Sequence, residues 1–452
     1  MGLAPHGLPL VGHALKLRRS PLQLLVEWQR MGDLVKLRMG RADAYFVCHP
    51  DLVHEVLVDA ETFDKGGPIY DKARTLMGNG LVTTRFSGHP RQRRLVRPAF
   101  QRSRLPKYVE TMARETAVEM DTWQPGGTID FGEAMHAVTA RATARALFEA
   151  ELPDASVRRI QQALPVFTEG VYQRSVAPFG IAERLPLPAT RRFNAARAAI
   201  ESVIDEVIAD HRRKDPDAGN AGLLAGDTDE GAPATTAELR DNMISVLLAG
   251  TETTAVSLSW AVHLLARHPE TERRLHAEVD AVLGGGVPAF EDLRRLPYLQ
   301  NTLMEALRLY PPVWMITRTT TADTTLGGRS LPAGTMVLAS PYAIQRDPRH
   351  WTAPDRFDPE RWTAPTAAPK NAMLPFLAGP RRCIGEATGF AEAAVALAVI
   401  AGRWRLRPAA EYGAPVPRAT LVPGPLPMTV EPRHGPTGES DSAAPTDTRR
   451  GG

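Results

Sequence analysis

One long helix constrains the fold of this chain more than any other feature of its sequence. Thr235 and Glu238 form a capping-box pattern, and apolar residues then continue to His268, where Pro269 ends the helix. A helix of about 33 residues is roughly 50 Å long, so it must cross the interior of the protein. The polar cluster at 251–254 in its apolar middle indicates that the helix interrupts its own packing there, which predicts a polar function at mid-helix.

The rest of the chain is predicted to be mainly helical with small β-sheets. Of its 452 residues, 43% are hydrophobic and 23% charged, which supplies a large core. The predicted elements are helices at 21–32, 51–63, 106–212 with breaks at 124–127 and 177–188, 269–284, 296–310 and after Cys383, and strands at 34–50, turning near Gly40, and at 324–340. We expect a mobile loop at 66–88, a solvated linker at 213–234, one domain over 1–432 and a disordered tail over 433–452.

Charge and cysteine content exclude several classes of protein. The net charge is +3, without a long run of Lys or Arg, which argues against nucleic acid as a partner. Cys48 and Cys383 are too few for a disulfide framework, so a reducing compartment fits. The first twenty residues, broken by Pro and Gly, have neither the apolar run of a transmembrane anchor nor the pattern of a signal peptide. We therefore expect a cytoplasmic protein in which Cys48 fills a buried apolar position.

The segment FLAGPRRCIGE carries the sharpest chemical signal. Phe376, Gly379, Arg381, Cys383 and Gly385 stand in it at F-x-x-G-x-R-x-C-x-G spacing. The glycines let the backbone wrap around the sulfur, and the helix that follows places the sulfur at a helix N-terminus, where a thiolate is stabilised. Without a second cysteine nearby, a tetrahedral zinc or iron–sulfur site lacks ligands, whereas a haem needs only one protein donor on one face.

This loop and three further motifs, in matching order, resemble the cytochrome P-450 family of haem-thiolate monooxygenases over residues 5–432. The resemblance implies the family's mainly α fold, with the long central helix across the haem. It also implies haem b as cofactor, Cys383 as the iron ligand and dioxygen as co-substrate. Position 377 is Leu where Gly is usual, from which we expect altered packing or redox poise with thiolate ligation retained.

Two of the motifs lie on predicted helices. Glu305 and Arg308 are one turn apart and can pair, and FDPERW supplies Arg361 to the same carboxylate, as in the family's structural triad. The stretch 249–253, AGTET, matches the family's A-G-x-D/E-T signature on the long helix.

The residue types of that signature suit a site for dioxygen. Gly250 would leave room for a diatomic ligand on the iron. The Thr253 hydroxyl can bond to the carbonyl of Ala249 and open the helix to water. Glu252 and Thr253 are then the candidate catalytic residues, an acid–alcohol pair that relays protons through that water.

The resemblance also assigns the residues around the cofactor and the substrate. The two haem propionates need cationic or donor partners, for which His89, Arg93, Arg318 and Arg381 are the candidates, with Phe376 and Gly385 as further cofactor contacts. Nearly all the residues placed at the substrate pocket are apolar, which suits a hydrocarbon. They are Ile69, Tyr70, Leu81, Val82, Phe167, Val171, Tyr172, Met243, Val246, Leu247, Gly250, Val313, Trp314, Met315, Ile316 and Leu426.

Several stretches, including TFDKGGPIYDKAR and EALRLYPPVWMITRTTTADTTLGG, resemble the actinobacterial terpene oxygenases typified by pentalenene oxygenase. This resemblance implies hydroxylation of a cyclic terpene of secondary metabolism, and it allows successive oxidations at one methyl carbon. Two alternatives stay open. A polyketide or macrolide tailoring oxygenase would bind large oxygenated ligands, and a non-catalytic haem sensor would bind gas without turnover, although intact Glu252 and Thr253 argue against the sensor.

The electrons are expected to come from a separate protein. The sequence shows no fused flavin or nicotinamide domain and no G-x-G-x-x-G fingerprint after a strand. By resemblance the donors are a ferredoxin and its reductase. The ferredoxin would dock on the cysteine side, against a group of arginines: Arg97, Arg102, Arg104, Arg381 and Arg382.

Overall fold

The computed structural model describes residues 2–5, 7, 12–40, 42–148, 152–176, 187–214, 234–364, 369–411 and 414–433. Three sequence predictions concern other residues. The tail from residue 434, the linker at 215–233 and the break at 177–186 lie outside the described residues.

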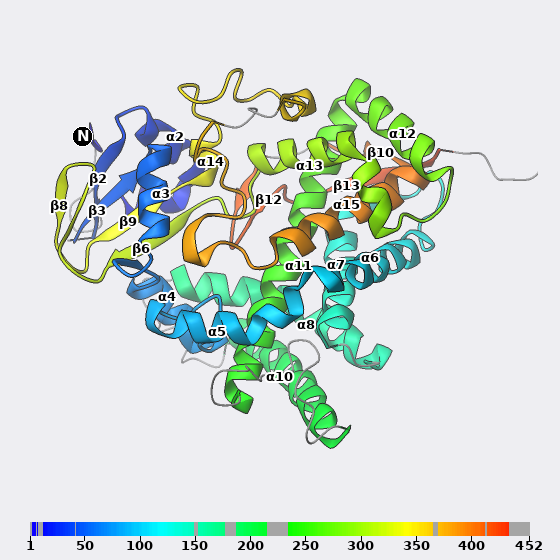
Figure 1. The fold of residues 1–452 in the computed structure, drawn as a ribbon, viewed down its shortest axis with the longest axis horizontal. Helices are drawn as coiled ribbons and strands as arrows, with labels where there is room; N and C mark the ends of the chain where they lie inside the picture. The colour runs from blue at the N-terminus through cyan, green and yellow to red at the C-terminus, as the bar shows by residue number, and fades with distance from the viewer. Residues whose placement is uncertain are drawn as a thin grey trace, which may run out of the picture.

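Helices make up most of the described structure, and the largest sheet lies at one side of it (Figure 1). The mainly α fold expected from the sequence is confirmed. The helices are α1 (Ala14–Arg19), α2 (Pro21–Gln29), α3 (Pro50–Val58), α4 (Gly67–Met77), α5 (His89–Val96), α6 (Leu105–Met120), α7 (Phe131–Phe148), α8 (Asp154–Val176), α10 (Pro188–Lys214), α11 (Thr236–Arg267), α12 (Pro269–Leu283), α13 (Pro297–Leu309), α14 (Pro341–Ile344) and α15 (Glu386–Arg403).

The described strands form one six-stranded sheet, in the order β1-β2-β3-β9-β6-β4, and smaller sheets β10-β13-β5, β11-β12 and β7-β8. As expected, β2 and β3 pair antiparallel across a turn at Gly40. The strands are β1 (Gly2–Leu3), β2 (Leu34–Met39), β3 (Ala42–Val47), β4 (Phe63–Asp64), β5 (Thr128–Asp130), β6 (Ile316–Thr320), β7 (Thr324–Leu326), β8 (Arg329–Leu331), β9 (Met336–Ala339), β10 (Trp404–Pro408), β11 (Val416–Pro417), β12 (Leu421–Val422) and β13 (Pro427–Pro432).

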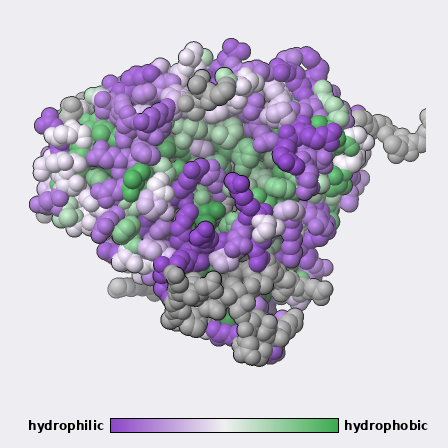
Figure 2. Space-filling view, viewed as in Figure 1, coloured by the Kyte–Doolittle hydropathy of each residue, from purple (hydrophilic) through white to green (hydrophobic). Residues whose placement is uncertain are grey.

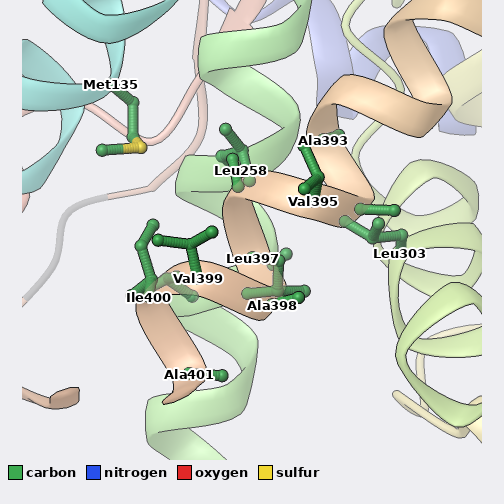
Figure 3. Close-up of a cluster of buried hydrophobic side chains, with 14 of the residues drawn as sticks. Met135, Leu258, Leu303, Ala393, Val395, Leu397, Ala398, Val399, Ile400 and Ala401 are labelled. Carbon is green, nitrogen blue, oxygen red and sulfur yellow. The ribbon is translucent and has the colours of Figure 1, made fainter. Parts of the chain in front are cut away.

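The predicted long helix is α11, and it runs through the interior. Its capping box is complete, because the Glu238 N–H donates to the Thr235 hydroxyl (3.2 Å) and the Thr235 N–H donates to the Glu238 carboxylate (3.0 Å). Figure 3 shows part of the core around it, where Leu258 of α11 lies near side chains of α7, α13 and α15. These neighbours hold α11 and α15 at fixed positions, which matters because the cysteine loop leads into α15. In the described part of the chain, no helix combines the length and apolar character that a bilayer span requires.

The prediction of a mobile loop at 66–88 is wrong over residues 67–77, which form α4. Gly67 and Gly78 have φ of +81° and +80° and stand at the two ends of this helix, and Pro68 lies in its first turn. Glycine and proline are tolerated at these positions, so they delimit the helix without breaking it. The sequence prediction treated them as breakers because it did not separate helix ends from helix interiors.

A buried ion pair ties α13 to the chain that leads toward Cys383. Arg308 donates to both carboxylate oxygens of Glu305 (2.9 and 2.8 Å), and neither side chain is exposed. Arg361 reaches the same carboxylate at 3.4 Å, as expected, and the Trp362 indole N–H adds a hydrogen bond of 3.0 Å. The remaining Arg308 donors bind backbone carbonyls at 345, 354 and 356. All the polar groups of the pair are thus engaged, as burial of charge requires.

We expect Arg308→Met to lower the free energy of unfolding by about 3–5 kcal/mol, because it leaves the Glu305 charge buried without its main partner. Arg361→Met is the matched control, since its contact with Glu305 is longer and its side chain is 12% exposed. We expect the control to cost less than about 1.5 kcal/mol. Denaturant titration measures the free energy of unfolding of both variants. Equal losses would contradict the role of Arg308 as the main partner of Glu305.

Candidate active site

The loop that carries Cys383 packs tightly between α3 and α15. Gly379 begins a 3-10 turn with φ of +71°, and a Cβ atom there would lie 2.2 Å from the Leu57 carbonyl oxygen of α3. Only glycine permits this approach. Beyond the turn, the Cys383 N–H donates to the Phe376 carbonyl (3.0 Å), and Gly385 is the N-cap of α15. The loop therefore presents the sulfur beside the start of a helix, as the sequence predicted.

The sulfur of Cys383 is exposed to an internal cavity, yet the protein alone does not favour its thiolate. Loss of hydration among the surrounding protein atoms raises the pKa of the thiol, although the Gly385 N–H and the Arg93 and Arg382 side chains act in the opposite direction. The stabilisation expected from the helix N-terminus is thus outweighed by desolvation. A bound metal cation would reverse the balance, because a coordinating thiol is deprotonated.

Leu377, the departure noted in the sequence, adopts a backbone conformation that suits glycine. Its φ is +59°, in the left-handed region that residues with a Cβ atom seldom enter. Its side chain is partly buried against the cluster that includes Val56, Leu57 and Leu374. The loop thus keeps the backbone path that glycine would allow and carries strain at this position.

The sulfur borders a cavity of about 270 Å³ between α11 and the Cys383 loop with α15. Figure 1 shows α11 passing beside α15 in this part of the molecule. The α11 side of the cavity is formed by Ser245, Val246, Ala249, Gly250, Thr253, Thr254 and Ser257. Leu81, Val82, Pro312 and Val313 extend its apolar wall.

At mid-helix, Thr253 behaves as predicted and Gly250 has a second role. The Thr253 hydroxyl donates to the Ala249 carbonyl (2.7 Å) and borders the cavity. Gly250 also borders the cavity, but a Cβ atom at that position would lie 3.2 Å from Cγ2 of Thr143 on α7. Close packing of α7 against α11 is therefore a reason for glycine here, besides the room for a small ligand that the sequence suggested.

Glu252 does not border the cavity that holds Cys383 and Thr253. Its carboxylate accepts a hydrogen bond from the Thr420 hydroxyl (2.9 Å) and lies 3.7 Å from Nδ1 of His136 on α7. Successive residues of a helix point about 100° apart, so adjacent positions can serve different sides. The acid and the alcohol of the predicted relay are thus neighbours in sequence that face different surroundings in this structure.

A group of basic side chains lies at one end of the cavity with a single carboxylate among them. Arg381 donates to Asp64 (2.7 Å) and to the Thr84 carbonyl (2.8 Å), and its Nε has no partner. Burial, together with Arg381, Lys65 and Arg93, lowers the pKa of His89 to about 4. Burial, together with Arg318 and Arg381, also lowers the pKa of Lys65. This excess of cations suits a ligand that carries carboxylates.

The residues present fit the haem expected from the resemblance. Within the described residues, no three His, Cys, Asp or Glu side chains gather closely enough to hold a metal ion, so the lone Cys383 thiol is the available metal ligand. The unpartnered Arg381 Nε and the cation-rich end of the cavity match two propionates. His89, Arg93, Arg381, Phe376 and Gly385 all border the cavity, whereas Arg318 is buried behind it, near enough to Lys65 and Arg381 to affect their pKa values.

Sequence reasoning missed Lys65 and Glu392, two charged residue types that border this cavity. Lys65 borders the cavity and donates to the Val82 carbonyl (2.8 Å). The sequence offered a signal for it, because Lys65 directly follows β4 within the stretch TFDKGG. Glu392 of α15 also borders the cavity, and burial raises its pKa to about 8. An acidic residue within the apolar run of that helix was a signal that the sequence offered.

Five of the residues predicted to line the substrate pocket border this cavity. These are Leu81, Val82, Val246, Gly250 and Val313. The other predicted residues do not border this cavity, and most of them pack in apolar clusters, because a sequence pattern marks a residue as apolar without distinguishing core from cavity. They are Ile69, Tyr70, Phe167, Val171, Tyr172, Met243, Leu247, Trp314, Met315, Ile316 and Leu426.

Comparison with known proteins gives a consistent result. Residues 3–427 match the family described as cytochrome P-450. The chain is 47% identical to "Cyclooctatin synthase" of Streptomyces melanosporofaciens over 95% of each chain. It is 44% identical to "Cyclooctat-9-en-7-ol 5-monooxygenase" of the same organism over 96% of this chain and 95% of the relative. It is also 38% identical to "Pentalenene oxygenase" of Streptomyces avermitilis, over 90% and 91% respectively.

The strain at position 377 can be measured with two variants that both lose the leucine side chain beyond Cβ. We expect Leu377→Gly to be more stable than Leu377→Ala by about 0.5–1 kcal/mol, because only alanine keeps a Cβ atom in the left-handed conformation. Ala378→Gly is the control, since its φ of −144° is ordinary for alanine, and this variant should lose stability. Denaturant titration measures the free energy of unfolding of each variant. If Leu377→Ala were more stable than Leu377→Gly, the backbone at position 377 would not be strained.

Proposed function

The chain belongs to the cytochrome P-450 family of haem-thiolate monooxygenases, and we propose that it hydroxylates a cyclic terpene held in the cavity beside Cys383. The observation that carries this proposal is the apolar wall of the cavity that holds the sulfur, formed by Leu81, Val82, Val246 and Val313. Such a wall orients a hydrocarbon by shape and offers few anchors for a sugar or a charged group. Two of the relatives are named for a cyclic alcohol, cyclooctat-9-en-7-ol, and for pentalenene, and these names support the same substrate class.

The reaction converts R–H, dioxygen, two electrons and two protons into R–OH and water. A haem bound at Cys383 supplies the binding and reductive activation of dioxygen. The basic side chains that border the cavity, Lys65, His89, Arg93 and Arg381, would hold the two propionates. The apolar wall excludes water and positions one C–H bond of the substrate.

In this proposal, Glu252 delivers protons and Thr253 holds the water that carries them. The Thr253 hydroxyl lies in the cavity with its own proton directed to the Ala249 carbonyl, so it can accept a hydrogen bond from a water and hold that water in place. Glu252 delivers its proton to this water after its carboxyl group leaves Thr420. The relay therefore requires a change of the Glu252 side-chain conformation.

We propose a ferredoxin, reduced by its reductase, as the electron donor, docking on the cysteine side. A groove there reaches Cys383, with an apolar floor that includes Phe290, Leu293 and Phe390, and Arg102 and Arg382 beside it. Figure 2 shows hydrophobic residues grouped in the middle of one face with hydrophilic residues around them. Arg381, predicted to dock the donor, is buried against Asp64, which leaves it unavailable to a partner. An acidic ferredoxin complements the exposed Arg97 and Arg102.

We also place the enzyme in the cytoplasm. Its two cysteines form no disulfide, Cys48 being buried as predicted and Cys383 facing the cavity. Free cysteines are usual in a reducing compartment, where soluble ferredoxins are also found.

The substrate proposal is tested by optical titration of the ferric protein with a cyclic terpene hydrocarbon such as pentalenene. We expect a saturable low-to-high-spin shift, because an apolar ligand in the cavity displaces water near the iron. Cys383→Ser is the control, and it should lose the thiolate signature of the reduced carbon monoxide complex. A shift given by large oxygenated macrolides but not by terpenes would replace the proposed substrate class, and a wild-type protein without the thiolate signature would end the enzyme proposal.

The relay is tested with Thr253→Ala and Thr253→Ser. We expect Thr253→Ala to keep the thiolate spectrum and the terpene-induced spin shift but to divert electrons to peroxide, because the hydroxyl that holds the water is gone. Product formed per electron pair, measured with a surrogate ferredoxin, should fall severalfold in the alanine variant. The loss should stay below the factor of about 10²–10⁴ that a positioned proton donor contributes, because water can still reach the cavity. Thr253→Ser should recover coupling, and a fully coupled alanine variant would disprove the relay.

A further inference from the structure

A second, much smaller cavity borders Glu252, and it shares no residue with the cavity beside Cys383. Its volume is about 10 Å³, close to the smallest space that admits one water molecule. Three helices form it: α7 contributes His136 and Ala140, α8 contributes Gln161, Leu164, Pro165 and Thr168, and α11 contributes Thr251 and Glu252.

One polar group at this cavity has no hydrogen-bond partner, and a second lacks its usual helical donor. The Thr251 hydroxyl is buried without a partner, and the residue is 3% exposed. Pro165 lies inside α8 and has no N–H, so it cannot donate to the Gln161 carbonyl one turn earlier. Buried polar groups in this situation commonly bind an ordered water.

The acid and the base at this cavity are placed for proton transfer. One carboxylate oxygen of Glu252 accepts from Thr420, and the other lies 3.7 Å from His136 Nδ1, beyond hydrogen-bond distance. Both side chains border the same small cavity, where one water can contact each of them. The His136 side chain is 27% exposed, so it also reaches solvent. The other described polar groups facing Glu252 are Gln161 and Thr168 of α8 with Thr420, none of which titrates near neutral pH.

We propose that His136 is the solvent-side proton relay that recharges Glu252, through one water held by Thr251 and the Gln161 carbonyl. The proposal rests on the function given above, because it supplies the protons that Glu252 passes to the cavity. Protonated His136 gives its Nδ1 proton to the water while that water gives a proton to the Glu252 carboxylate. The neutral imidazole then takes a proton from bulk solvent, which restores the starting state.

The first test compares His136→Gln with the wild-type protein during turnover with a surrogate ferredoxin. Glutamine keeps the hydrogen-bonding capacity of the side chain but cannot titrate. We expect kcat to fall about tenfold, less than the full contribution of a positioned acid, because bulk water can still reach Glu252 more slowly. The solvent deuterium isotope effect on kcat should increase, while the thiolate spectrum and the terpene affinity measured by spin shift stay unchanged.

Thr251 supplies an independent test that does not depend on how well the His136 variant folds. Thr251→Val removes a hydroxyl that has no protein partner, so stability should not fall. We expect a slower kcat with a larger solvent isotope effect, and Thr251→Ser should restore both values. His54→Gln, on the partly buried face of α3 outside both cavities, is the matched histidine control and should behave as wild type.

The outcomes separate this inference from the proposed function. If His136→Gln and Thr251→Val both keep wild-type turnover and isotope effect while Glu252→Gln is slow, the solvent-side relay is overturned and the role of Glu252 stands. If Glu252→Gln is itself fully active and coupled, the proposed proton route is wrong as a whole. Slow turnover in both His136→Gln and Thr251→Val, with unchanged spectra and terpene affinity, supports the inference.

Discussion

The position of the Cys383 loop depends on a buried guanidinium. Arg308 pairs with Glu305 and at the same time binds carbonyls of the segment that follows α14, including that of Gln345. The Gln345 side chain in turn donates to two carbonyls at the end of α13 and accepts from the Leu374 N–H. Leu374 lies two residues before Phe376, where the loop begins, so a continuous series of hydrogen bonds joins α13 to the chain that presents the sulfur. This network explains why charged groups are retained in a core where apolar packing alone would be at least as stable.

The central helix serves two cavities of different character. Ala249, Gly250 and Thr253 face the large, mostly apolar cavity that contains Cys383, whereas Thr251 and Glu252 face the small polar one toward α7 and α8. The division follows from helix geometry, because neighbouring positions point about 100° apart. The five residues 249–253 therefore include Thr253, which borders the cavity beside Cys383, and Glu252, which borders the small cavity on the other side of the helix. In the proposed relay, the Glu252 side chain crosses this separation when it carries a proton to the water held by Thr253.

How much the sequence predicted depended on whether the relevant contacts were local. The capping box at Thr235, the turn at Gly40 and the Cys383 loop were predicted correctly because each is specified by residues close together in the chain. The orientation of Glu252 could not be predicted, since it is set by Thr420, 168 positions away. Local patterns also failed to separate cavity from core, so Leu426 was assigned to the substrate although it packs in the main cluster. Lys65 was overlooked because its importance comes from the distant cations gathered around it.

The scarcity of anions around those cations has a consequence for how the protein is loaded with its cofactor. The pKa of His89 in the folded chain is about 4, below its usual 6.5. The fold therefore loses stability as the pH falls through 6.5, because the unfolded chain binds a proton there and the folded chain does not. Carboxylates brought by a ligand would draw the pKa values of His89 and Lys65 back upward. Binding of a carboxylate-bearing cofactor is thereby linked to proton uptake, so mildly acidic conditions favour it.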